Sequence, residues 1–292
     1  MSWTSLSQVY SPMSGNPAID GLIWTNQASY NYQLPAQTSI NYSFDSSAAV
    51  AAPDNIGVST MDAGQQSGVV QMLNYVSSVT GITFTNTTGN SSAPVDLFFG
   101  YSGDFNYGWY GVDYNNVTYG QDASGNINSL DIHDSILLNP NYDFLNSTGL
   151  GSVGYDVLLH EIGHALGLKN AEDGPNVLSG QYDSPDQTIM TQAIVLDPGE
   201  QQTFGQFGTL DIQALNWLYG GDGLLGTYGL TTDANGNPKA GGFNPALPGS
   251  TTAGAAGTAL AALTTTPATA SPVAATGLPA TPNQPGQLFA LS

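Results

Sequence analysis

The hydrophobic and polar positions of this chain change their period several times before residue 220. From 39 to 44, apolar and polar residues alternate, which predicts a half-buried strand. From 62 to 80, apolar residues recur every three or four positions, and Gly81 follows. We therefore predict a helix that ends at this glycine. The apolar face of that helix consists of Val69, Val70, Leu73, Val76 and Val79.

Short apolar runs predict buried strands at 82–85, 95–100 and 136–138. The stretch 100–129 is rich in Gly, Asn, Asp and Tyr, which predicts long loops. Such loops can supply calcium with oxygen ligands, but plain turns are the favoured interpretation.

Apolar residues at helical spacing predict two further helices, at about 153–166 and at 210–218. Beyond about Gly241 the composition shifts to Ala, Thr, Pro and Gly, with few large apolar residues. Such a segment cannot bury a core, so we predict a flexible low-complexity tail.

Composition excludes several classes of partner. The formal charge is −20, from 22 acidic residues against Lys169 and Lys239. A chain this acidic cannot neutralise a phosphate backbone, so we expect neither nucleic acid nor a membrane as partner. With no cysteine, disulfides and thiolate zinc sites are excluded. Residues 1–16 lack a basic stretch followed by an apolar core, so no signal peptide is predicted there.

The candidate chemistry lies in His160-Glu161-Ile162-Gly163-His164, which contains two of the three histidines in the chain. Residues four apart share one helix face, so both imidazoles can reach one metal ion. Glu161 would then contact a water bound to that metal. This is the HExxH pattern of zinc hydrolases. The alternative, a histidine pair with a purely structural role on an apolar helix, is less favoured.

The stretch from His160 to Leu168 resembles the zinc helix of the metzincin peptidases, whose full pattern is HExxHxxGxxH followed by a methionine turn. Among metzincins it is most similar to the serralysins, alkaline proteases that bacteria export. The similar elements keep the family's order: 19–24, 40–44, 62–80, 82–84, 95–100, the turn Thr188-Ile189-Met190 and 210–220. The resemblance implies an α/β (α+β) fold with a twisted mixed sheet, in which 17–220 is the catalytic domain and 221–292 a tail.

The resemblance also assigns roles to residues. His160 and His164 match the first two ligands of a zinc ion (Zn²⁺), Glu161 matches the general base, and Met190 matches the methionine beneath the metal. The position of the third zinc ligand is occupied by Asn170 in place of histidine. The methionine turn of serralysins continues Ser-Tyr, whereas this chain continues Thr191-Gln192.

Asn170 leaves three hypotheses about the metal. As a ligand for zinc, an amide oxygen is neutral and binds more weakly than imidazole. An asparagine also has no ring N–H through which a neighbouring carboxylate could orient it, as happens for histidine ligands. Asn170 could ligate through its oxygen in a weakened site. Asp173, Asp183 or His133 could be the third ligand in place of Asn170, although the sequence around each of them is also compatible with an ordinary loop residue. Otherwise the site is degenerate and binds no metal.

The function implied by the resemblance is that of a zinc-dependent endopeptidase acting on protein or peptide substrates. Zinc would activate a water molecule, whose proton Glu161 would take and return to the leaving amine. The substrate would lie extended along an edge strand containing Ile136 to Leu138. The alternatives are an inactive metzincin homologue that binds peptides or proteins, and a surface protein whose tail is a spacer.

Serralysins also carry calcium-binding GGxGxDxxx repeats and are exported through a C-terminal signal. Here only Gly220-Gly221-Asp222-Gly223-Leu224-Leu225 is faintly similar to such a repeat, so calcium in a β-roll is not supported. The apolar end Leu288-Phe289-Ala290-Leu291 is compatible with the export signal. We therefore expect a secreted, extracellular monomer.

Overall fold

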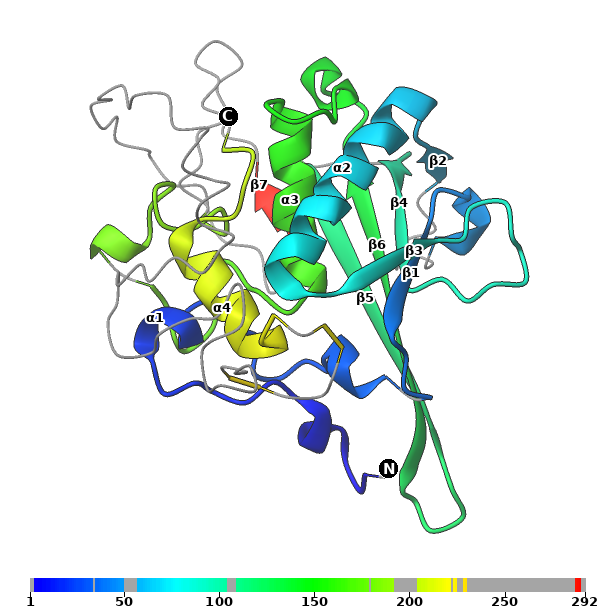
Figure 1. Ribbon diagram of the computed structural model, residues 1–292, viewed down its shortest axis with the longest axis vertical. Helices are drawn as coiled ribbons and strands as arrows, with labels where there is room; N and C mark the ends of the chain where they lie inside the picture. The colour runs from blue at the N-terminus through cyan, green and yellow to red at the C-terminus, as the bar shows by residue number, and fades with distance from the viewer. Residues whose placement is uncertain are drawn as a thin grey trace, which may run out of the picture.

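A mixed, twisted β-sheet forms the centre of the protein, and the helices α2 and α3 lie side by side across one of its faces (Figure 1). This mixed α/β architecture confirms the predicted fold class at that level. None of the helices in the described ranges is long and apolar enough to cross a membrane. The computed structural model describes residues 3–33, 35–49, 57–103, 109–178, 180–191, 204–221, 223–224, 228–229 and 287–289.

The sheet combines parallel inner strands with antiparallel neighbours. β1, β3, β4 and β6 run parallel, whereas β5 is antiparallel to β6, β7 to β5, and β2 to β4. Along the sheet the order is β3 (Thr83–Asn86), β1 (Ser39–Ser43), β4 (Leu97–Ser102), β6 (Ile127–Leu138), β5 (Trp109–Gln121) and β7 (Gln287–Phe289), with β2 (Val58–Thr60) paired to β4 off this path.

The long loops predicted for 100–129 are wrong over most of that stretch. β5 and the first part of β6 form a long hairpin that projects from the rest of the molecule (Figure 1). Its turn is held by the carboxylate of Asp122, which accepts the backbone N–H of Ser124 at 2.8 Å and of Asn126 at 2.9 Å. Much of the outer hairpin is exposed, so its strands arise from pairing with each other and leave little apolar alternation to detect. Residues 104–108 lie outside the described part of the chain.

The strand predicted at 136–138 is the C-terminal end of β6 and has β4 and β5 on its two sides. The expectation that Ile136 to Leu138 belong to an edge strand is therefore wrong. The antiparallel strand β5 lies outside β6, because its hairpin connection brings it back along that side of the sheet.

The long helices agree with the predictions. α2 (Ala63–Thr80) begins at a capping box, in which Asp62 accepts the backbone N–H of Gln65 at 2.9 Å and Gln65 accepts that of Asp62 at 2.7 Å. It ends at Gly81, whose φ of 74° is left-handed and favours glycine. The final helix, α4, spans Thr209–Tyr219.

The third helix, α3 (Val153–Ala165), is buried along its whole length. Burial of this kind suits its apolar residues but removes water from the polar ones, which then need partners inside the protein. The remaining helical segments are short: η1 (Leu6–Val9), α1 (Pro17–Asp20), η2 (Tyr30–Tyr32), η3 (Ser46–Ala48), η4 (Asp143–Asn146) and η5 (Gly180–Tyr182).

The two faces of the sheet belong to different apolar clusters. The main core contains Ile132, Ile136 and Leu138 of β6 together with the apolar residues of α2 and α3. On the opposite face, Leu137 packs with Phe98 and Val112 in a small separate cluster. Even-numbered residues at this end of β6 therefore face α3, and odd-numbered ones face away from it.

Carboxyl groups on β5, β6 and α3 are buried. Asp134 is fully buried, where its carboxyl accepts hydrogen bonds from the hydroxyl of Tyr30 and from the Asn115 amide at 2.7 Å. Burial raises the pKa of Asp134 to about 7 and that of Asp156, on α3, to about 6. Burial, followed by the charges of Asp134 and Glu161, also raises the pKa of Asp113.

The raised pKa of Asp134 predicts that this carboxyl contributes less to the stability of the metal-free protein at pH 8 than at pH 5. In the folded state it retains a proton that the unfolded chain loses above about pH 4, so its contribution to the free energy of unfolding falls as pH rises towards 7. Buried histidines with lowered pKa values act in the opposite direction, so the measurement compares wild type with Asp134→Asn. With a chelator present, we expect wild type to lose about 5 °C of melting temperature relative to this variant from pH 5 to pH 8. A difference between the two proteins that stays constant with pH would contradict the assignment.

Candidate metal centre

The two histidines of α3 point their Nε2 atoms at each other, 3.0 Å apart. The Nδ1 atom of His160 lies 2.8 Å from the carbonyl oxygen of Ile189, and that of His164 lies 3.1 Å from the carbonyl oxygen of Leu168. A carbonyl oxygen can only accept, so each Nδ1 carries the proton. Both rings thus present a bare Nε2 lone pair to the same point.

Neither ring can relieve this contact by taking up a second proton near neutral pH. Burial, with a smaller contribution from His164, lowers the pKa of His160 to about 3. Burial also lowers the pKa of His164 to about 4. Two neutral acceptors that face each other repel unless a cation lies between them. In tetrahedral zinc sites the Zn–N distance is about 2.0–2.1 Å, which puts two nitrogen ligands about 3.3 Å apart, close to the separation here.

Asn170 adds a third acceptor to the same point. Its side chain is buried and interacts with both imidazoles, raising the pKa of each, as an acceptor does. Its amide nitrogen donates to the Asp173 carboxylate at 2.9 Å, and this bond sets the orientation of the amide. The Asn170 oxygen is then left facing the imidazoles, buried and without a hydrogen-bond donor. Asp173 thus fixes the orientation of the Asn170 side chain, in the way that a hydrogen-bonded carboxylate fixes the ring of a histidine that binds a metal.

The other candidate ligands are placed differently. His133 is an odd-numbered residue of β6, and its ring interacts with the backbone of Ala48, whose side chain packs in the cluster away from α3. Asp183 follows η5 in a loop and is half-buried. Across the described ranges, no three His, Cys, Asp or Glu side chains come together as a metal-binding group. An amide oxygen is thus the third acceptor that the structure brings to the histidine pair.

Glu161 lies on α3 beside this centre and faces β5. Both its carboxylate oxygens are buried, and neither meets a donor in hydrogen-bonding geometry. Burial raises the pKa of Glu161 well above its ordinary value, and the backbone amide of Asp113 opposes that shift only in part. A buried carboxyl of this kind is poised to exchange a proton with a reacting group.

The turn at Ile189 and Met190 packs against α3 and contacts the histidine pair. A Cβ atom on Gly163 would lie 2.8 Å from the Met190 sulfur, so the glycine permits the methionine to pack directly under α3. The Asp211 carboxylate accepts the backbone N–H of Ile189 at 2.7 Å and the hydroxyl of Thr188. Burial raises the pKa of Asp211 to about 7. Through Ile189, this network fixes the carbonyl that orients His160.

Lys169 anchors the loop that carries Asn170. Its ammonium group is buried and donates to the carbonyl oxygens of Gly21 at 2.5 Å, Asp173 at 2.7 Å and Asn176 at 2.7 Å. Burial lowers its pKa to about 8. The backbone of Lys169 also donates to Leu22 at 2.9 Å, so the N-terminal segment and this loop are joined next to the centre.

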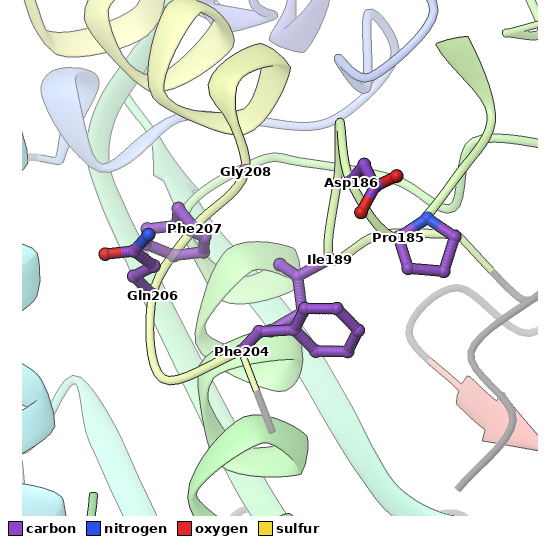
Figure 2. A pocket seen from close by; sticks show the side chains of 7 residues that line it. All are labelled: Pro185, Asp186, Ile189, Phe204, Gln206, Phe207 and Gly208. Atoms are coloured by element: carbon purple, nitrogen blue, oxygen red, sulfur yellow. The ribbon is translucent and has the colours of Figure 1, made fainter. Parts of the chain in front are cut away.

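A pocket lies beside the Ile189 turn, and Figure 2 shows the side chains around it. The side chain of Ile189 lines the pocket while its carbonyl oxygen contacts His160, so the pocket and the histidine pair share this residue. In the figure, Phe204 and Ile189 lie next to each other and face Pro185 and Asp186. The complete lining is Pro185, Asp186, Ile189, Phe204, Gln206, Phe207 and Gly208.

Sequence reasoning missed two residues that position the centre, Lys169 and Asp211, and also Asp113, whose backbone amide interacts with the Glu161 carboxyl. A signal existed for Lys169, because it is one of two lysines and precedes Asn170. Gln192, which replaces the tyrosine of the serralysin turn, lies outside the described residues. The sequence matches no known family model and no curated protein.

Proposed function

We propose that this protein is a zinc-dependent endopeptidase of the metzincin type. The observation that carries the proposal is the convergence of three buried acceptors, the Nε2 atoms of His160 and His164 and the Asn170 oxygen. Three acceptors without a donor are unfavourable in a folded protein unless a cation binds them. Two imidazoles with one oxygen suit zinc.

A bound zinc ion would polarise a peptide carbonyl and acidify a water molecule at that point. The residues of the chain supply the rest. Glu161 takes the proton from the water as the water oxygen bonds to the carbonyl carbon, and it returns that proton to the leaving nitrogen as the C–N bond breaks. The buried environment of Glu161 suits this role, because a cation nearby lowers a pKa that burial has raised.

The surroundings of the centre support a peptide as the substrate. β5 runs past Glu161, antiparallel to β6, and its other edge pairs with the short strand β7; an edge of this kind can also pair with an extended peptide. The pocket beside Ile189 can receive one substrate side chain next to the reacting bond. Two local features also support the proposal: Met190 packs under Gly163, and the chain turns at Gly167, whose φ of 99° is left-handed.

The proposal is tested by incubating the purified full-length protein with casein in the presence of one zinc equivalent. We expect fragments to accumulate, cleavage to stop when 1,10-phenanthroline removes zinc, and activity to return on adding zinc. Casein that stays intact although zinc is bound would contradict the peptidase and leave an inactive peptide-binding homologue. Fragments that accumulate equally with the chelator would show that hydrolysis does not depend on this centre.

A further inference from the structure

The edge of β5 carries a short strand from the far end of the chain. β7 lies beside α3 and contacts it (Figure 1). It pairs antiparallel with β5, with Phe289 opposite Trp109, Leu288 opposite Gly111, and Gln287 opposite Val112. The predicted flexible tail thus contains three residues that join the sheet. The rest of the suggested export segment, Ala290 and Leu291, lies outside the described residues.

Gly111 places this part of β5 directly against the candidate general base. A Cβ atom on Gly111 would lie 2.6 Å from Val157 and 2.9 Å from the Oε1 atom of Glu161. Any strand added to β5 here lies about 4.8 Å further out, the ordinary spacing of paired strands. Because Leu288 is opposite Gly111, β7 occupies the position beside Glu161 that an extended peptide substrate requires.

The edge that receives β7 is held rigidly from the β6 side. Asn139 donates its side-chain amide to the carbonyl oxygen of Trp109 at 2.6 Å and its backbone N–H to that of Tyr110 at 2.9 Å. The Tyr110 ring packs edge-on against Tyr142 and Phe144, with centroids 4.8 and 5.2 Å away. The β5–β7 register shifts between Trp109 and Gly111, so Tyr110 is the extra residue of a bulge. A preformed edge can accept an incoming strand without rearranging.

We propose that the C-terminal segment around Gln287–Phe289 is an intramolecular competitor of peptide substrates at this edge. The inference rests on the proposed peptidase function and concerns its regulation. Strand pairing uses main-chain groups, so an extended substrate can replace the tail at the same position. A three-residue strand is short enough to dissociate, and because it belongs to the same chain its return to β5 is an intramolecular event. Gln287–Phe289 contains no charged residue, so the pairing of β7 beside Glu161 and Asp113 introduces no like charge.

The test compares the zinc-loaded full-length protein with Leu288→Pro and Ala275→Pro. Proline at position 288 removes a main-chain donor and disfavours pairing with β5. Ala275→Pro adds a proline to the same tail outside β7 and is the matched control. We expect Leu288→Pro to lower the KM of a peptide substrate about fivefold at unchanged kcat, because less of the edge is occupied. An equal KM in all three proteins would overturn the inference.

A binding measurement separates this inference from the peptidase function. A fluorescent peptide with the sequence of residues 286–292 is titrated into Glu161→Gln protein, with and without Leu288→Pro, and anisotropy is recorded. We expect about fivefold tighter binding when the internal tail carries proline. Equal affinities, or no binding to either protein, would overturn the docking of the tail. Tighter binding to the Leu288→Pro protein, together with no cleavage of casein by the zinc-loaded wild type, would support the docking and contradict the peptidase function alone.

Discussion

Glu161→Gln is expected to lower kcat for peptide hydrolysis about a thousandfold while leaving zinc bound, the loss typical of removing a general base. The amide has nearly the same shape as the carboxyl but cannot take up the proton of the attacking water. Folding should survive, because neither carboxylate oxygen accepts a hydrogen bond of good geometry in the metal-free protein, and the amide oxygen of glutamine can still face the backbone amide of Asp113. Steady-state hydrolysis of a quenched peptide gives kcat, and zinc content is measured on the same samples.

Glu172→Gln is the matched control for this substitution. Glu172 is an exposed carboxylate on the loop after Asn170, so this substitution makes the same chemical change at a side chain outside the buried centre. We expect kcat within about twofold of wild type for this variant. If the Glu161→Gln protein binds zinc and keeps the wild-type kcat, Glu161 is not the general base.

Asn170→Ala should weaken zinc binding about a hundredfold, because the third acceptor is lost while the two imidazoles stay in place. Asn170→His should strengthen zinc binding above wild type, since imidazole is a better zinc ligand than an amide oxygen. Competition with a chromophoric chelator gives the dissociation constants of the three proteins.

Asp173→Ala separates a ligand from the group that orients it. Asp173 accepts the amide nitrogen of Asn170 at 2.9 Å, so its removal should cost about tenfold in zinc affinity, less than the loss of Asn170 itself. If Asn170→Ala binds zinc as tightly as wild type, the amide oxygen is not a ligand, and the third position belongs to water or to another residue.

The parts of the fold that the sequence predicts are those with local causes. Both ends of the helix at 63–80 can be predicted from local residues: the Asp62–Gln65 capping box at its start and Gly81 at its end. The histidine pair needs only helical spacing to place both imidazoles together. In contrast, the β5–β6 hairpin is stabilised by pairing between its own exposed strands, and in the pairing of β7 with β5, Phe289 is opposite Trp109, 180 positions earlier. Neither pairing leaves a periodic signal in a single segment.

In the candidate metal centre, too, features with local causes could be predicted and features that depend on distant residues could not. The spacing of His160, Glu161 and His164 was sufficient to predict that they lie together on one helix, and the structure places all three on α3. The orientation of Asn170 could not be predicted, because it depends on Asp173 and on the anchoring of its loop by Lys169 to Gly21. That contact joins residues 148 positions apart. Hydrogen bonds of such long range are set by the finished fold.

The most direct test of the account is the zinc content of the protein after exhaustive dialysis, compared with His164→Ala and His133→Ala. His164 contributes one of the converging lone pairs, whereas His133 interacts with Ala48 away from α3. The account predicts one zinc per chain in the wild type and in His133→Ala, and none in His164→Ala. A wild-type protein without zinc, or a His164→Ala protein that retains it, would contradict the assignment of this centre.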